Sequence, residues 1–378
     1  MTIDLITIIA ASAVLLLALI TPMMSPFFRR PRQESGDSAT DLPPVTVLLV
    51  SNGDHTALDE HLPLYLTQEY APGYHIVVVT EKADLETENV LKRYSNNERL
   101  YHTFVPESSR YMSKSKLAIT LGVKAAKEEW IVLTDPRCKP ADSHWLAALA
   151  TRFTTHSNLV LGYSNYADES PRLHRFERLH TALYLLREAQ KGRAYATNCQ
   201  YVAFRKSQYM ENHGYLEYLK YSIGEYDFLV DKYAPMGHTE VALDPPTRLI
   251  ENPISDKSWQ NKQVYAHEVA RHLERGGTAR VLHGLDQCAL HLNYLLILAT
   301  GIFAGLTSRW ILLGACVAAL CITLALRILI GKKALADYQV DIPAWRIIPL
   351  EIGMLRHNIL TRMRYEYADK NDFISHKV

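Results

Sequence analysis

Residues 113–146 read SKSKLAITLGVKAAKEEWIVLTDPRCKPADSHWL, and this stretch decides the fold class. Its first part predicts a helix over Ser115–Lys127, because leucine and alanine side chains recur there on one face. The apolar run WIVLT at residues 130–134 is typical of a strand that is buried on both faces. A polar turn that begins with Asp135 follows at once. A helix that leads into a buried strand is the repeating unit of a parallel sheet.

The same alternation extends toward the N-terminus. Buried strands are predicted at Val45–Val50 (VTVLLV) and His75–Thr80 (HIVVVT), and a weaker strand at Leu100–Val105. Helical patterns at Ala57–Gln68 and Leu85–Tyr94 separate them. We therefore expect an α/β domain with a Rossmann-like, mostly parallel sheet. Ligands of such sheets bind outside the carboxyl ends of the strands, so the polar residues there become candidates for a site.

The pattern becomes less regular in the second half of this domain. Short strands are predicted at Leu159–Tyr163 and Tyr201–Phe204, with a long helix at His174–Gln190 between them. A further helix is predicted at Glu225–Tyr233. The apolar stripe of the long helix is explained by packing alone.

Three apolar runs are long enough to cross a bilayer as helices, namely Leu5–Met24, about Cys288–Leu306, and Trp310–Ile330. A cleaved signal peptide is the alternative for the first run. No basic segment precedes that run and no small-residue cleavage site follows it, so we expect an uncleaved anchor. The third run contains Arg327, which can extend toward the membrane surface, and neither of the last two runs has the paired acids of an ion path.

The basic residues predict the orientation of these spans. They cluster at one end of each run, whereas the turn between the second and third runs holds only Arg309. The positive-inside rule then places the N-terminus outside, and the large middle segment and C-terminal tail in the cytoplasm. The basic residues concerned are Arg29, Arg30, Arg32, Arg271, Arg275, Arg280, Lys332 and Lys333.

The composition excludes several other classes of protein. The 378-residue chain has a formal net charge of +1, so no strong field favours a nucleic acid as partner. Its five cysteines form no C-x-x-C pair, which argues against a zinc ribbon and a disulfide framework. In the tail, Trp345–Arg364 reads as a basic amphipathic helix. This helix can lie on the anionic inner leaflet or dock against the cytoplasmic domain, and periodicity does not separate the two.

The order of these segments resembles the membrane-associated family 2 glycosyltransferases, which have the GT-A fold. The resemblance covers roughly residues 44–331, and its most specific part is Ser113–Leu146. It is carried by the N-terminal anchor, the two C-terminal spans and the segments VTVLLVSNGDHTALDEHLPLYLTQEY (45–70), HIVVVTEKAD (75–84), residues 113–146, GRAYATNCQYVAFRKS (192–207), GEYDFLVDK (224–232) and SWQNKQVYAHEVARHL (258–273).

The resemblance implies a division of the chain into regions. It implies a glycosyltransferase domain over residues 45–284, with a nucleotide-sugar half over 45–150 and an acceptor half over 151–284. The flanking regions are an anchor over 1–30, a linker over 31–44, two transmembrane helices over 285–331 and a cytoplasmic tail over 332–378.

In that family a D-x-D motif ends the strand before the active site and holds a divalent metal, Mg²⁺ or Mn²⁺, on the donor's diphosphate. Asp135 matches the first aspartate and is the candidate metal ligand, but Arg137 stands at the second position. Arg137 can supply a fixed positive charge in place of the metal, since a guanidinium pairs with phosphate oxygens. The other interpretations are that the site has lost catalysis, or that Asp135 merely caps the turn before Pro136.

The general base of the family is a carboxylate at the start of a helix, which takes the proton of the acceptor hydroxyl. The matching segment is Gly224-Glu225-Tyr226-Asp227. Tyr226 occupies the position of the base, and a tyrosine with a pKa near 10 is a poor base at neutral pH. Glu225 and Asp227 are therefore the catalytic candidates. The alternative is that these acids only stabilise the start of the helix, by complementing its dipole.

Three further residues match donor-binding positions of the family. Glu81 would contact the nucleoside, Lys116 would lie beside the donor, and Arg271 would bind its diphosphate. Lys116 is otherwise a solvated helix lysine, and Arg271 is otherwise held by lipid phosphate. Glu268 stands where the family has the glutamine of its Q-x-x-R-W motif.

The resemblance implies an inverting hexosyltransferase of family 2. It would move a sugar from a nucleotide-diphosphate-sugar donor to a membrane-proximal, lipid-linked or envelope glycan acceptor. Its partners would be the donor, the acceptor and membrane lipids, with no nucleic acid, and its location would be the inner membrane. Because Arg137, Tyr226 and Glu268 depart from the family pattern, the alternative is a non-catalytic membrane subunit with a degenerate site. A transporter is a weaker alternative, because so large a soluble insert and only three spans do not suit one.

Overall fold

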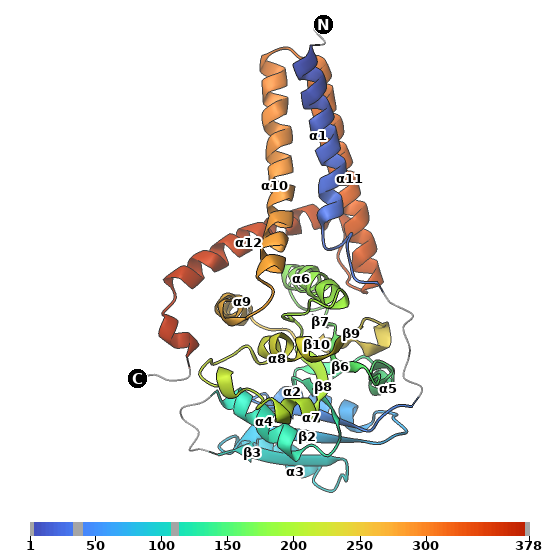
Figure 1. The fold of residues 1–378 in the computed structure, drawn as a ribbon, viewed down its shortest axis with the longest axis vertical. Coiled ribbons are helices and arrows are strands. Elements are labelled where there is room, and N and C mark those ends of the chain that lie inside the picture. The colour runs from blue at the N-terminus through green and yellow to red at the C-terminus, as the bar shows by residue number, and fades with distance from the viewer. Residues whose placement is uncertain (1–3, 33–40, 107–112, 375–378) are drawn as a thin grey trace. The chain divides into compact units, whose positions relative to one another are not determined.

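The computed structural model describes residues 4–32, 41–106 and 113–374. The chain divides into two compact units, and Figure 1 labels the elements of both. One unit holds residues 1–30 and 277–358, and the other holds residues 31–276 and 359–378. We call the first the helical unit and the second the α/β unit.

The α/β unit is built on a seven-stranded sheet of order β3-β2-β1-β4-β8-β6-β9. The strands β3, β2, β1 and β4 are parallel, β8 runs antiparallel to β4 and β6, and β9 is parallel to β6. This confirms the mostly parallel sheet predicted from the apolar runs. The bounds are β1 Val45–Val50, β2 Tyr74–Glu81, β3 Leu100–Val105, β4 Trp130–Thr134, β6 Ser157–Gly162, β8 Tyr201–Arg205 and β9 His238–Ala242.

A second, three-stranded sheet of order β5-β10-β7 lies in the same unit. Strand β10 (Leu249–Glu251) pairs antiparallel with β5 (Cys138–Pro140) and parallel with β7 (Ser164–Tyr166). These strands have three residues each, too few to show an alternating pattern in the sequence. This small sheet ties the turn after β4 to β10, more than a hundred residues further along the chain.

The helices of the α/β unit agree closely with those predicted. α2 begins two residues earlier than expected, and α4 begins after Ser113, whose hydroxyl caps the helix by accepting the Lys116 N–H. The bounds are α2 His55–Leu66, α3 Leu85–Arg93, α4 Lys114–Ala125, α5 Trp145–Ala150, α6 Arg172–Gln190, α7 Lys206–Glu211, α8 Glu225–Tyr233 and α9 Asp256–His272, with 3₁₀ turns at Leu216–Tyr218, Ala234–Met236, Pro245–Thr247 and Lys370–Phe373.

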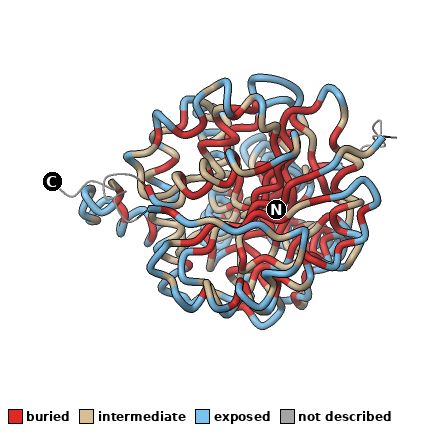
Figure 2. Tube along the Cα trace, turned by 90° about the horizontal axis from the view of Figure 1, so that it is seen from below, coloured by how far each residue is buried: buried red, intermediate tan, exposed pale blue. Residues whose placement is uncertain are grey.

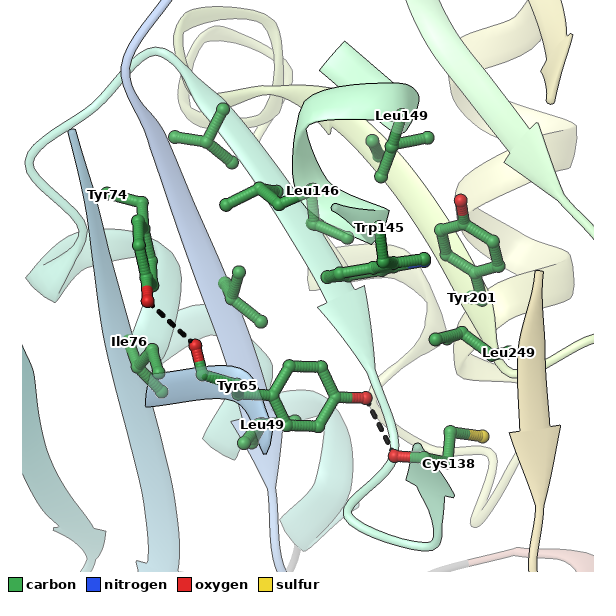
Figure 3. Packing of buried hydrophobic residues seen from close by; sticks show 14 of the residues in the cluster. Leu49, Tyr65, Tyr74, Ile76, Cys138, Trp145, Leu146, Leu149, Tyr201 and Leu249 are labelled. Carbon is green, nitrogen blue, oxygen red and sulfur yellow. Dashed lines mark hydrogen bonds between the residues drawn. The ribbon is translucent and has the colours of Figure 1, made fainter. Parts of the chain in front are cut away.

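The hydrophobic core of this unit runs through the sheet, where the buried trace of Figure 2 is concentrated. Aromatic side chains fill its centre. Tyr65 meets the edge of Trp145 with ring centroids 5.7 Å apart, and Trp130 stacks on Phe153 at 4.3 Å. Figure 3 shows Trp145 between Tyr65 and Tyr201. Rings packed at such geometry stabilise a core beyond the area that they bury.

Three helices of the helical unit are long and apolar enough to cross a membrane: α1 (Leu5–Met24), α10 (Gly277–Leu306) and α11 (Trp310–Asp337). In Figure 1, α1 lies alongside α11 and α10. The second helix begins at Gly277, well before the apolar run expected from Cys288, because the polar residues in between continue the same helix. The helix α12 (Ile347–Tyr367) follows the 3₁₀ turn Ala344–Arg346 and spans both units.

Arg327 does not extend to the membrane surface as the sequence suggested. It is buried and forms two parallel hydrogen bonds of 2.8 Å with the carboxylate of Glu351. A guanidinium in this setting needs a charged, hydrogen-bonding partner, and Glu351 supplies one from α12. From residue 359 onward the tail belongs to the α/β unit, where Tyr365 stacks against His267 of α9.

Candidate active site

The turn after β4 holds an ion pair between Asp135 and Arg137, which are two positions apart in the chain. Asp135 Oδ1 accepts hydrogen bonds from the backbone N–H and the Nε of Arg137, and Oδ2 accepts one from Nη2, each at 2.9 Å. Both carboxylate oxygens are therefore occupied by the residue at the second position of the motif. The two side chains remain partly accessible, with 15% of Asp135 and 30% of Arg137 exposed.

The helix α2 holds this turn from the protein interior. His61 Nδ1 lies 2.8 Å from the carbonyl oxygen of Pro136, and the Tyr65 hydroxyl donates to the carbonyl oxygen of Cys138 at 2.7 Å. Figure 3 shows the second of these bonds. His61 and Tyr65 are four residues apart, so they lie on one face of α2. Both are fully buried, and the turn is fixed at two carbonyl groups on either side of Arg137.

A buried cluster of charges lies next to the turn. Glu251 at the end of β10 is fully buried, and it pairs with Arg178 of α6 at 2.9 Å and with Lys262 of α9 at 3.5 Å. Burial would raise the pKa of Glu251, but the charges of Arg178, Lys262 and Arg137 outweigh it and lower that pKa. Gln200 connects the Asp135–Arg137 ion pair with this cluster, since its side chain lies 3.4 Å from Arg137 Nη2.

The amide of Gln200 is better placed with its oxygen and nitrogen exchanged. In that orientation the oxygen accepts from Lys262 Nζ at 3.2 Å, and the nitrogen donates to Glu251 and Asp135 at 3.3 Å. Gln200, Glu251, Lys262 and Arg178 were not found from the sequence. They come from α6, β10, α9 and the loop before β8, and no local pattern connects them.

The N-terminus of α8 brings its acids to this cluster. Gly224 precedes it with φ = 93°, and a side chain there would meet Val269 at 2.8 Å, so glycine is required. Asp227 accepts the N–H of Thr197 at 3.1 Å. Burial and the charge of Glu225 raise the pKa of Asp227 to about 7, while the charge of Lys262 opposes them.

Tyr226 lies on the same turn of α8. Its pKa is raised by burial and by the negative charge of Asp135, while Arg137 opposes them. A phenol whose pKa is raised cannot serve as a base at neutral pH. The interactions of Tyr226 and Asp227 thus connect the start of α8 with Asp135, Arg137 and Lys262.

Lys116 is placed differently from the expectation that it lies beside a donor. Its side chain is fully buried, and Nζ donates to the carbonyl oxygens of Tyr221 and Ile223 at 2.7 and 2.8 Å. Burial lowers the pKa of Lys116 to about 8, with the charge of Glu225 opposing. The ammonium therefore fixes the segment that leads through Gly224 into α8.

Glu81 is the last residue of β2 and Asp135 follows β4, and both strands are parallel to β1, so the two acids lie at the same edge of the sheet, as predicted. Glu81 forms an ion pair of 2.5 Å with Lys114. Arg271 donates to the hydroxyl of Tyr365 at 2.9 Å, and that hydroxyl donates to Glu268 at 2.6 Å. Arg271 is thus held by the C-terminal segment of the α/β unit, and neither it nor Glu81 contacts the cluster around Glu251.

These residues do not fit a divalent cation. Such a cation needs several oxygen ligands, and both oxygens of Asp135 already accept from Arg137. Within the described ranges 4–32, 41–106 and 113–374, no group of three or more His, Cys, Asp or Glu side chains is placed to hold a metal ion. The metal-ligand prediction for Asp135 thus gains no second ligand from the structure.

Comparison with solved structures identifies the fold. The mannosyltransferase PcManGT from Pyrobaculum calidifontis, solved in complex with GDP-Man and Mn²⁺, superposes with a TM-score of 0.55 over 95% of this chain and 98% of its own, at 14% identity. The chain has the GT-A fold. A structure of S. aureus TarS residues 1–349 with UDP-GlcNAc is 11% identical and covers 86% of this chain and 92% of its own, with a TM-score of 0.42. No protein-family model and no curated protein matches the sequence.

Proposed function

We propose that this GT-A protein is an inverting glycosyltransferase that moves a sugar from a nucleotide-diphosphate-sugar to a membrane-proximal, lipid-linked or envelope glycan acceptor. One observation carries the proposal. The partly accessible Asp227, whose pKa is about 7, lies at a helix start that is electrostatically coupled to the cations beside β4. A carboxylate with a pKa near the working pH is suited to general-base catalysis.

The reaction would be a single displacement. Asp227, or Glu225 beside it, takes the proton of the acceptor hydroxyl as that oxygen bonds to the anomeric carbon. The bond from this carbon to the donor phosphate breaks, and its electron pair leaves with the nucleoside diphosphate. Fixed positive charge at the leaving group stabilises this transition state most, because that is where negative charge develops. Since one step inverts the anomeric carbon, no covalent enzyme intermediate is required.

The other predicted residues take supporting roles in this proposal. Glu81, at the shared sheet edge, is assigned to the nucleoside, and Lys116 to positioning the segment before α8. Arg271 remains assigned to the diphosphate. Three apolar helices in the same chain favour a membrane-proximal acceptor, with the α/β unit and the C-terminus in the cytoplasm and the N-terminus outside. The domain limits at residues 45, 150 and 284 belong to the same proposal.

The second candidate is a non-catalytic membrane subunit that binds a nucleotide or a protein partner. The observation in its favour is the closed ion pair of Asp135 with Arg137, which replaces the second carboxylate of the family motif. Tyr226 and Glu268 depart from the family pattern as well.

Release of nucleoside diphosphate from a panel of nucleotide sugars separates the two candidates. The detergent-solubilised full chain is incubated with each donor and a membrane lipid extract as the source of acceptor. We expect release with one donor, its loss in Asp227→Asn, and normal release in the control Glu98→Gln, which changes an exposed acid far from the site. No release with any donor would favour the non-catalytic subunit.

A further inference from the structure

Two cations of the site remain accessible although most charges around them are buried. The side chains of Arg137 and Lys262 are 30% and 34% exposed, whereas Arg178 is 2% exposed. Arg178 is therefore held inside by Glu251, whereas the other two cations keep part of their side chains open to solvent. Both contact Gln200, so they lie on either side of one amide group.

Arg137 is oriented by its neighbour and still has donors to offer. Nε and Nη2 are engaged by Asp135, and within the described part of the chain Nη1 makes no hydrogen bond. A guanidinium held in one plane with free N–H groups is suited to a phosphate oxygen. Lys262 adds a compact ammonium at the end of a flexible side chain, which can follow a second phosphate.

A divalent metal has no comparable place here. To ligate one, Asp135 would have to give up two charge-assisted hydrogen bonds to Arg137, and the guanidinium would then stand beside the metal as a like charge. At this turn positive charge is supplied by the side chain of Arg137.

We propose that Arg137 and Lys262 together bind the diphosphate of the donor without a divalent cation. This rests on the proposed transferase function and specifies its leaving-group site. When the bond to the anomeric carbon breaks, the electron pair passes to the diphosphate, and the two cations neutralise the charge that develops there. Glu251, which is itself held by Arg178, lies beneath them and keeps Lys262 in place.

The test is nucleotide binding, measured by isothermal titration of the detergent-solubilised full chain with UDP and with GDP. Each titration is made with EDTA and again with MnCl₂. We expect at least one nucleotide to bind with the same Kd in both buffers. Arg137→Gln and Lys262→Ala should each weaken that binding about 10- to 100-fold, as expected for the loss of a charged hydrogen bond.

The matched control is Lys257→Ala, which removes an exposed lysine from the same helix and should leave the Kd unchanged. The comparison of buffers uses the unaltered protein, so it does not depend on how well any variant folds. Circular dichroism and the thermal midpoint without nucleotide show whether Arg137→Gln retains the fold.

Three results would count against the proposal. Binding that disappears in EDTA and returns with Mn²⁺ would overturn the metal-free site but leave the transferase function standing. Folded Arg137→Gln and Lys262→Ala variants that bind like the native chain would overturn the assignment of these two cations. If neither nucleotide binds in either buffer, the proposed diphosphate site is overturned, whereas the transferase function is decided separately by release of nucleoside diphosphate from the panel of donors.

Discussion

The buried ammonium of Lys116 makes the stability of the α/β unit depend on pH in a defined way. In the folded chain the pKa of Lys116 is lowered from 10.5 to about 8, chiefly by burial. Between these two values the unfolded chain keeps a proton that the folded chain has released. Stability therefore rises with pH across this interval, and below about pH 8 this group contributes no slope.

The size of this effect follows from the difference in pKa. A difference of about 2.5 corresponds to about 3.4 kcal/mol in total, at about 1.36 kcal/mol for each pKa unit. Of this, about 2 kcal/mol is recovered between pH 7 and about pH 9.5, before ordinary tyrosines begin to titrate. For a domain of this size that is a change of about 4–8 °C in the thermal midpoint.

The perturbation is Lys116→Met, which keeps the length of the side chain and removes the titrating group. Thermal unfolding of the solubilised chain is followed at a series of pH values. The thermal midpoint of the native chain minus that of the variant should rise by about 4–8 °C between pH 7 and about pH 9.5. This slope is unaffected by the constant cost of leaving the carbonyl groups of Tyr221 and Ile223 without their donor.

The control for this experiment is Lys124→Met, which removes an exposed lysine from the same helix α4. Its curve should run parallel to that of the native chain. If the curve of Lys116→Met also runs parallel to the native curve from pH 7 to about pH 9.5, the ammonium is not buried as described and the reasoning is wrong.

Three further predictions follow from the site and its surroundings. If Asp227 is the base, the rate of sugar transfer should rise through about pH 7, where its pKa lies, and Glu225→Gln should keep the activity but move this rise to lower pH, because the charge of Glu225 raises that pKa; a rise near pH 4 to 5 in the native chain would point to an acid with an ordinary pKa. Glu251→Gln leaves the buried Arg178 without its partner and should destabilise the unit by about 3–5 kcal/mol, seen as a lower thermal midpoint; a loss below about 1 kcal/mol would contradict this. Phe373 is buried and meets the ring of Tyr265 edge-on, with ring centroids 5.0 Å apart, so it anchors the C-terminal segment. Phe373→Ala should therefore make residues 359–374 more sensitive to limited proteolysis, and an unchanged cleavage pattern would refute that role.

The sequence was sufficient to predict the parallel half of the sheet. Runs such as VTVLLV and HIVVVT are mostly apolar and do not alternate with polar residues, as is typical of a strand covered on both faces. Their order along the chain then fixed the edge at which Glu81 and Asp135 would lie, because parallel strands end on the same side. The three apolar helices could be predicted for a similar reason, since length and composition alone define them.

The supporting half of the site could not be predicted in this way. Glu251 lies in a strand of three residues, and Lys262 lies on a helix that reads as polar and exposed. Their meeting depends on how β10, α6 and α9 pack, which no local period encodes. Lys116 was misplaced for a related reason: the pattern of α4 marks it as polar, and only the tertiary structure shows that the segment before α8 covers it.

A metal ion and a fixed cation meet the same electrostatic need by different physical means. A metal must be bound from solution and loses part of its hydration shell, whereas Arg137 is part of the chain and is already held in one plane by Asp135. The turn that carries Asp135 and Arg137 is itself held by His61 and Tyr65 of α2, so the guanidinium has little freedom to reorganise. Charge that is oriented before the reaction begins stabilises a transition state most effectively. In the proposed site, Asp135 therefore changes from a metal ligand into the residue that orients the cation.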